Sequence, residues 1–123
     1  MSMDQREHRR VFKALLAKIN YSGGECFGYV HNLSKTGFGI TTDHNIPMAS
    51  EVLIDVKMPP KRIIRTGGRV VWQRTLPPGS PNGYMVGVKL VLAPPEYSEF
   101  IEELIKKEDE LLSVVSGNKK GPN

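Results

Sequence analysis

The sequence predicts a mainly β protein, with about six antiparallel strands in a small closed or nearly closed barrel and one C-terminal helix. Between residues 11 and 90, apolar stretches of strand length alternate with turn signals. The 12 glycines and 9 prolines favour many turns over a helical bundle. After residue 94 the apolar residues recur at helical spacing instead. The 123 residues suffice for one domain with a single core.

The first three strands are predicted from two turns. Residues 11–21 form an apolar stretch that ends at Ser22-Gly23-Gly24, where glycine reaches the positive φ of a tight hairpin at little steric cost. Residues 25–32 return antiparallel to that stretch, and residues 37–42 follow after the turn at 34–36. These segments predict a hairpin that continues into a third strand.

The next three strands are predicted from alternation and from their breakers. Residues 50–58 place apolar side chains on one face and mostly polar ones on the other. Residues 63–73 contain Gly67-Gly68, which predicts a bulge or a bend. A proline-rich loop at 77–83 joins this strand to the last one, in which residues 84–90 alternate again.

An amphipathic helix is predicted over residues 96–115. Pro94-Pro95 stand at its start, because proline lacks only an N–H that the first helical turn leaves unpaired anyway. The apolar face of this helix must cover a sheet, a barrel end or a partner.

Residues 1–10 show no apolar periodicity and predict a flexible N-terminal arm, and residues 116–123 predict a disordered tail. The domain proper therefore spans residues 11–115.

The composition indicates a cytoplasmic protein without membrane insertion. The single Cys26 excludes an intramolecular disulfide and fits a reducing compartment. No apolar run approaches the roughly 20 residues that span a bilayer, and the polar N-terminus does not resemble a signal peptide. The formal net charge of +4 is a modest basic excess that is compatible with a phosphate ligand.

Two short patterns supply the candidate binding residues. Arg6-x-x-x-Arg10 offers two planar guanidiniums that are always charged. About one hairpin later, Asn32-x-Ser34-x-x-Gly37 offers an amide, a hydroxyl and a glycine in a tight turn. Such groups bind a planar, anionic, hydrogen-bonding ligand rather than transform it.

Neither pattern contains a nucleophile, a general base or a set of metal ligands. His8, His31 and His44 have no paired metal spacing, and no Ser-His-Asp or Cys-His arrangement is evident. We therefore expect no catalytic activity, no metal and no cofactor. Each pattern alone also has an ordinary interpretation: a solvated charged arm for the first, and an Asx or Ser turn between strands for the second.

In this order, at this separation and inside an all-β frame, the two patterns resemble the PilZ domain, a bacterial receptor for the second messenger cyclic di-GMP. The resemblance covers about residues 5–107, and segments 68–72 and 84–90 are similar to the later strands of the family. It implies a PilZ-like six-stranded antiparallel β-barrel of Greek-key type with a C-terminal amphipathic helix. It also implies cyclic di-GMP as the ligand.

The resemblance also implies roles for the two patterns. Arg6 and Arg10 would bind phosphates and guanine. On an extended arm the two side chains lie on one face, roughly 13 Å apart. A guanidinium can pair with a phosphate or with the O6/N7 edge of guanine. Asn32 and Ser34, two residues apart, are expected to point the same way and to contact a guanine edge, and Gly37 is expected to shape the turn. Many family members carry Asp where this chain has Asn32, so we expect a lower affinity here.

Arg9 and Arg69 are further candidate phosphate contacts. Trp72 stands near Tyr84 in alternating strands, and we interpret it as part of the core or the barrel rim rather than as a stacking residue.

A single-domain receptor of this family would signal through an unidentified protein partner, using the ordered arm or the exposed part of the helix. The resemblance implies motility, exopolysaccharide production or biofilm control as the pathway, and we expect a monomer or a weak dimer. Two alternatives stay open. One is a PilZ-like protein in type IV pilus assembly that binds no ligand, although such relatives lack the arginine pair. The other is a small barrel for single-stranded nucleic acid, which the aromatic content of 7% does not favour.

Overall fold

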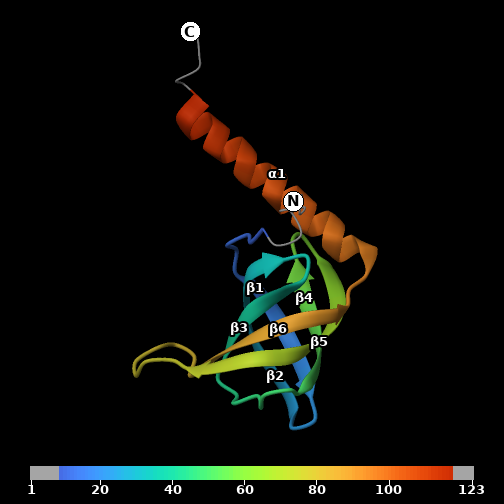
Figure 1. The fold of residues 1–123 in the computed structure, drawn as a ribbon, viewed down its shortest axis with the longest axis vertical. Helices are drawn as coiled ribbons and strands as arrows, with labels where there is room; N and C mark the ends of the chain where they lie inside the picture. Colours follow the sequence, from blue (N-terminus) through green and yellow to red (C-terminus); the bar gives the residue numbers. More distant parts are fainter. Residues whose placement is uncertain (1–8, 118–123) are drawn as a thin grey trace, which may run out of the picture.

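The computed structural model describes residues 9–117, with side chains described as far as Val114. Six antiparallel strands close into a barrel in the order β1-β2-β3-β6-β5-β4, and one helix follows (Figure 1). The predicted fold class is confirmed: β6 lies between β3 and β5, as a Greek-key connection requires. The elements are β1 (Leu15–Tyr21), β2 (Gly24–Ser34), β3 (Gly37–Thr42), β4 (Glu51–Met58), β5 (Arg62–Thr75), β6 (Tyr84–Leu92) and α1 (Pro95–Gly117).

The start of the chain differs from the predicted first strand. β1 begins at Leu15, and Val11 instead forms an isolated antiparallel bridge with Leu33 near the end of β2. Val11 N donates to Leu33 O at 2.7 Å, and Leu33 N donates to Val11 O at 2.9 Å. The segment that follows the arm is therefore fixed beside the turn between β2 and β3. Residues 1–8 of the predicted arm lie outside the described residues.

The barrel interior follows the predicted alternation. In β4, the residues Val52, Ile54, Val56 and Met58 all point inward and are at most 4% exposed. The predicted irregularity at Gly67-Gly68 is confirmed as a register shift between β5 and β6. The sequence pattern thus assigned the core face of β4 correctly.

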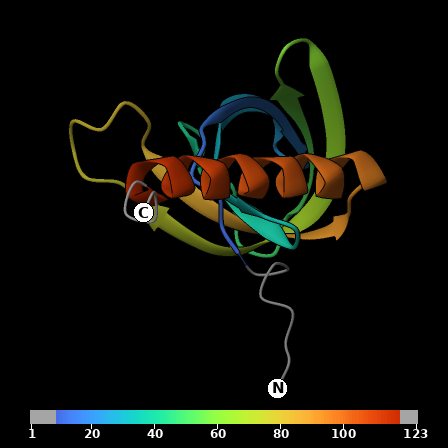
Figure 2. The same cartoon turned by 90° about the horizontal axis from the view of Figure 1, so that it is seen from above.

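Helix α1 lies across one end of the barrel, as the two views in Figures 1 and 2 show. Beyond residue 105 the helix extends past the barrel, and Leu111 is largely exposed. α1 begins at Pro95, close to the predicted start, and continues to Gly117, two residues beyond the predicted end. Its barrel-facing side consists of the buried residues Tyr97, Phe100, Ile101, Leu104 and Ile105.

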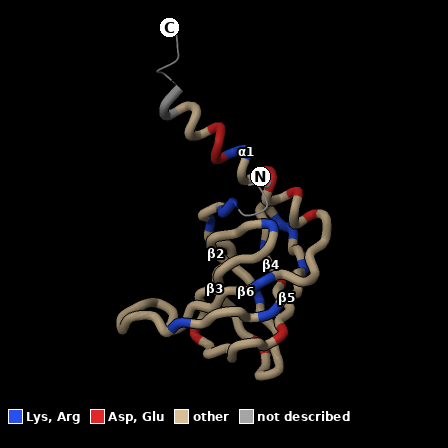
Figure 3. The backbone as a smooth tube through the Cα atoms, in the orientation of Figure 1, with Lys and Arg blue, Asp and Glu red and all other residues tan. Residues whose placement is uncertain are grey.

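Charge is distributed unevenly between these two parts. Aspartate and glutamate gather on α1, whereas lysine and arginine are spread over the barrel (Figure 3). Within residues 9–117, no helix combines the length and the apolar character of a transmembrane span.

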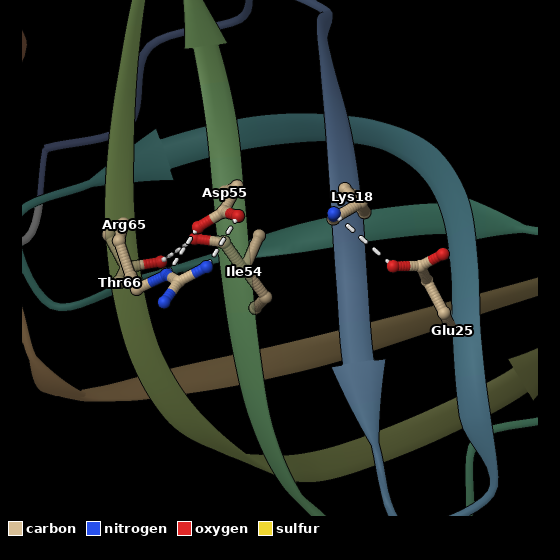
Figure 4. A network of polar contacts seen from close by, with 6 residues as sticks. All are labelled: Lys18, Glu25, Ile54, Asp55, Arg65 and Thr66. Carbon is tan, nitrogen blue, oxygen red and sulfur yellow. Dashed lines mark hydrogen bonds and ion pairs between the residues drawn. The ribbon is translucent and has the colours of Figure 1, made fainter.

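A polar network joins neighbouring strands of the barrel (Figure 4). Arg65 on β5 donates from Nε to Asp55 Oδ1 at 2.7 Å and from Nη2 to Asp55 Oδ2 at 2.9 Å, so the pair is bidentate. Lys18 on β1 pairs with Glu25 on β2 at 3.2 Å. The hydrogen bonds from Arg65 lower the pKa of the Asp55 carboxyl below its ordinary value, and partial burial opposes this shift.

We expect Asp55→Asn to lower the melting temperature near neutral pH and to have a smaller effect in acid. A lowered pKa in the folded state stabilises the protein above the unfolded pKa of about 3.9. That contribution is lost as the pH falls through the lowered folded value. Thermal unfolding between about pH 7 and pH 3 should therefore show a wild-type advantage that narrows with falling pH. Arg65→Gln should behave in the same way, and a constant difference across the range would contradict the assignment.

Candidate functional site

The turn between β2 and β3, residues 32–37, is irregular from its first residue. Asn32 has φ of 52°, a conformation that asparagine tolerates better than most residues. The β2–β3 register shifts between His31 and Ser34. This bulge breaks the two-residue alternation, so Asn32 and Ser34 do not point the same way as predicted. Asn32 is half-buried and lines a surface pocket, whereas Ser34 is fully buried.

Ser34 binds the turn and the helix. Its Oγ donates to Gly37 O at 3.2 Å and accepts from Thr36 N at 3.3 Å. Its carbonyl oxygen accepts a hydrogen bond from the Tyr97 hydroxyl of α1 at 2.6 Å. Burial raises the pKa of the Tyr97 phenol, which therefore stays protonated and able to donate. The 32–37 turn is thus attached directly to the helix.

Gly37 is required by strand spacing rather than by the turn conformation expected from the sequence. Its φ is not positive. A Cβ at this position would lie 2.3 Å from Val88 O on β6, which is backbone and cannot swing away. Any larger residue would push β3 and β6 apart.

Arg10 joins the first sequence pattern to the second. Its Nη1 donates to Asn32 O at 2.5 Å and to Gly37 O at 3.4 Å. The carbonyls that Arg10 binds belong to the first and last residues of the 32–37 turn. Arg6, the other arginine of the pattern, lies outside the described residues.

Arg10 also lies at an open pocket of about 760 Å³ on the outer face of the barrel, here called the Arg10 pocket. Strands β3, β5 and β6 form most of its wall, with a lining that is largely apolar or glycine. Lys89 is the second cation of the lining. His31 precedes Asn32 in the chain, and burial lowers the pKa of its imidazole, so this group adds little positive charge at neutral pH. The lining comprises Arg10, Phe12, Asn32, Thr36, Gly37, Phe38, Gly39, Val71, Trp72, Gly87, Val88 and Lys89.

Trp72 belongs to this pocket, which the sequence interpretation missed. A Cβ on Gly87 would lie 2.1 Å from the indole nitrogen, so the ring rests directly on the β6 backbone. The side chain stays 41% exposed, and the Arg74 guanidinium carbon lies 5.6 Å from the ring centroid. The register shift between Val70 and Trp72 leaves Trp72 on the outer surface. The sequence signal that could have indicated this contact is Gly87 on β6, which pairs with Trp72 on β5.

The two remaining candidate arginines lie elsewhere. Arg9 Nη2 is 3.1 Å from Glu108 Oε1 and 2.8 Å from Asp109 Oδ1, both on α1. Arg69 lies on β5 at a different surface pocket, 3.5 Å from Glu51. Neither residue lines the Arg10 pocket. Within residues 9–117, no group of three His, Cys, Asp or Glu side chains is arranged to hold a metal ion.

Comparison with known proteins identifies the class. The family model of the PilZ domain matches residues 4–107, so the chain belongs to the PilZ domain family. The fold is similar to that of the Bacillus subtilis inhibitor of motility MotI/DgrA, with a TM-score of 0.71 and 15% identity over 88% of this chain and 53% of that one. This chain thus spans about half the length of MotI/DgrA.

A second similar structure is the PilZ domain of YcgR from Escherichia coli, solved with c-di-GMP. It has a TM-score of 0.63 and 11% identity over 93% of this chain and 98% of that one. At these identities both likenesses concern the fold. Comparison with curated proteins found no similar sequence.

Proposed function

We propose that this protein binds cyclic di-GMP in the Arg10 pocket and acts as a signalling receptor and adaptor. The observation that carries the proposal is the meeting of Arg10 with the 32–37 turn at the edge of a pocket that also exposes Trp72. Cyclic di-GMP presents two phosphates and two guanines, so it needs fixed positive charge and flat apolar surface side by side. The solved YcgR domain with c-di-GMP supports this choice of ligand.

Each group of the pocket matches one part of the ligand. Arg10 uses Nη1 for the turn carbonyls, and within residues 9–117 its Nε and Nη2 groups make no hydrogen bond, so they can bind a phosphate or a guanine edge. Lys89 supplies a second positive charge, and Trp72 and Phe12, 41% and 76% exposed, offer rings for base stacking. We propose that Asn32 binds a guanine edge and that Arg6 completes the arginine pair.

Signalling would then pass to a protein partner in the cytoplasm, with the receptor a monomer or a weak dimer. The arm or the projecting part of α1 would form the contact. The motility inhibitor MotI/DgrA among the structural neighbours makes motility the first pathway to test. The protein would carry no catalytic function.

The only tryptophan of the chain makes a direct reporter of binding. Titration with cyclic di-GMP should change Trp72 fluorescence, because a guanine on the indole replaces water, and calorimetry should give the same dissociation constant. GMP and a single-stranded oligonucleotide serve as comparison ligands, and the affinity for cyclic di-GMP should fall as salt rises because phosphates are neutralised. Absence of heat and of any fluorescence change up to about 50 μM ligand would overturn the proposal.

A further inference from the structure

The side chains of the consecutive residues Arg9 and Arg10 bind different parts of the molecule. Arg10 binds the carbonyls of the 32–37 turn, whereas Arg9 binds Glu108 and Asp109 on α1. The Arg9 side chain is about one-third exposed, as is that of Glu108. Both acids lie just beyond the last part of α1 that the barrel buries. Arg9 therefore connects the base of the arm to the point at which the helix leaves the barrel.

The same helix is also attached to the 32–37 turn. Lys35 in the 32–37 turn forms an ion pair with Glu102, and Tyr97 donates to Ser34 O in the same turn. Both sequence patterns thus contact α1, one through the arm and one through the turn. A change in either contact must alter how well the helix is held.

We infer that Arg9 is a positioning residue: its ion pairs with Glu108 and Asp109, here called the acid pair, hold the arm so that Arg10 faces the ligand. This inference rests on the proposed function, and it assigns Arg9 a role other than the phosphate contact expected from the sequence. It also makes α1 part of the binding apparatus. By thermodynamic reciprocity, a ligand that favours the anchored arm equally strengthens the docking of the helix.

Neutralising the acid pair should change ligand affinity in opposite directions under the two explanations, general electrostatics and positioning by Arg9. Glu108→Gln/Asp109→Asn removes two negative charges near an anionic ligand, so general electrostatics would tighten binding. Loss of the anchor would instead weaken it, because the arm then has to be ordered when the ligand binds. The sign of the change therefore separates positioning from general electrostatics and from direct contact by a freed Arg9.

The test is a double-mutant cycle measured by calorimetry near physiological salt, which limits long-range effects. We expect Arg9→Ala and Glu108→Gln/Asp109→Asn each to weaken cyclic di-GMP binding roughly three- to fivefold, the size of a partly exposed ion pair. The triple variant should be no weaker than Arg9→Ala alone. The control Glu103→Gln/Glu110→Gln removes two exposed charges of the same helix and should not weaken binding. Equal or tighter binding by the acid-pair variant, or additive losses, would overturn the inference.

A second readout needs no ligand. The Val11 amide donates to Leu33 O beside the arm, so its hydrogen exchange reports how firmly the arm base is held. Exchange should accelerate in Arg9→Ala and in the acid-pair variant, and not in the control. If wild type binds no cyclic di-GMP, the proposed function fails, and unchanged Val11 exchange in the acid-pair variant would separately refute the anchor. Melting temperatures identify any variant that merely loosens the helix.

Discussion

Arg10→Ala should weaken cyclic di-GMP binding by about 100-fold or more. The substitution removes a guanidinium at the edge of the pocket, next to both ends of the 32–37 turn. Two charge-assisted hydrogen bonds to the ligand contribute about 1.5 kcal/mol or more each, which corresponds to two orders of magnitude in affinity. Calorimetry and Trp72 fluorescence provide independent measurements of the dissociation constant.

Two further variants make this prediction specific. Arg10→Lys keeps the charge and loses the planar fork, so it should restore only a small part of the affinity. Arg69→Ala is the matched control, since Arg69 lies outside the Arg10 pocket and should change binding less than about twofold through screened long-range charge. Tight binding by Arg10→Ala, or an equal loss in Arg69→Ala, would refute the assigned site.

Gly37→Ala should both destabilise the barrel and impair binding. The added Cβ would meet Val88 O at 2.3 Å, so β3 and β6 must separate at the point where the 32–37 turn begins to pair. Overpacking of this kind costs about 1–3 kcal/mol in the free energy of unfolding. The displaced turn also moves the carbonyl that Arg10 binds.

Gly39→Ala provides the matched comparison on the same strand. Its Cβ would lie 3.0 Å from the Met85 Cε atom, the end of a flexible side chain, and its next neighbours are at 3.8 Å. Urea unfolding should therefore show a clear loss of stability for Gly37→Ala and little change for Gly39→Ala. Equal stabilities of the two variants would contradict the close-approach role of Gly37.

Much of the fold could be predicted because local periodicity decides which side chains turn inward. The β4 alternation and the change to helical spacing after Pro95 needed no knowledge of distant residues. The bulge at Gly67-Gly68 could also be predicted, since glycine weakens a regular strand. The predicted start of the first strand at residue 11 was wrong, because Val11 forms a single bridge with Leu33, an interaction between separate segments.

The candidate site could be predicted only in part. Arg10 and the 32–37 turn do meet, as the two patterns indicated. Ser34 and Trp72 were assigned the wrong surroundings, because register shifts in β2 and β5 reverse the faces that simple alternation assigns. Neither of these two shifts lies at a glycine of its own strand, unlike the bulge at Gly67-Gly68, and each depends on the partner strand, so the pattern of one strand does not reveal it.

Local chemistry is enough to predict the element types, the inward face of β4 and the two patterns, since each depends on neighbouring residues in the chain. Folding of the whole chain decided that Trp72 rests on Gly87 and that the Ser34 carbonyl accepts a hydrogen bond from Tyr97 of α1. It also decided that Arg9 reaches Glu108, 99 positions further along the chain. These contacts form when the barrel closes and α1 folds across its end, which brings together residues that no local pattern connects.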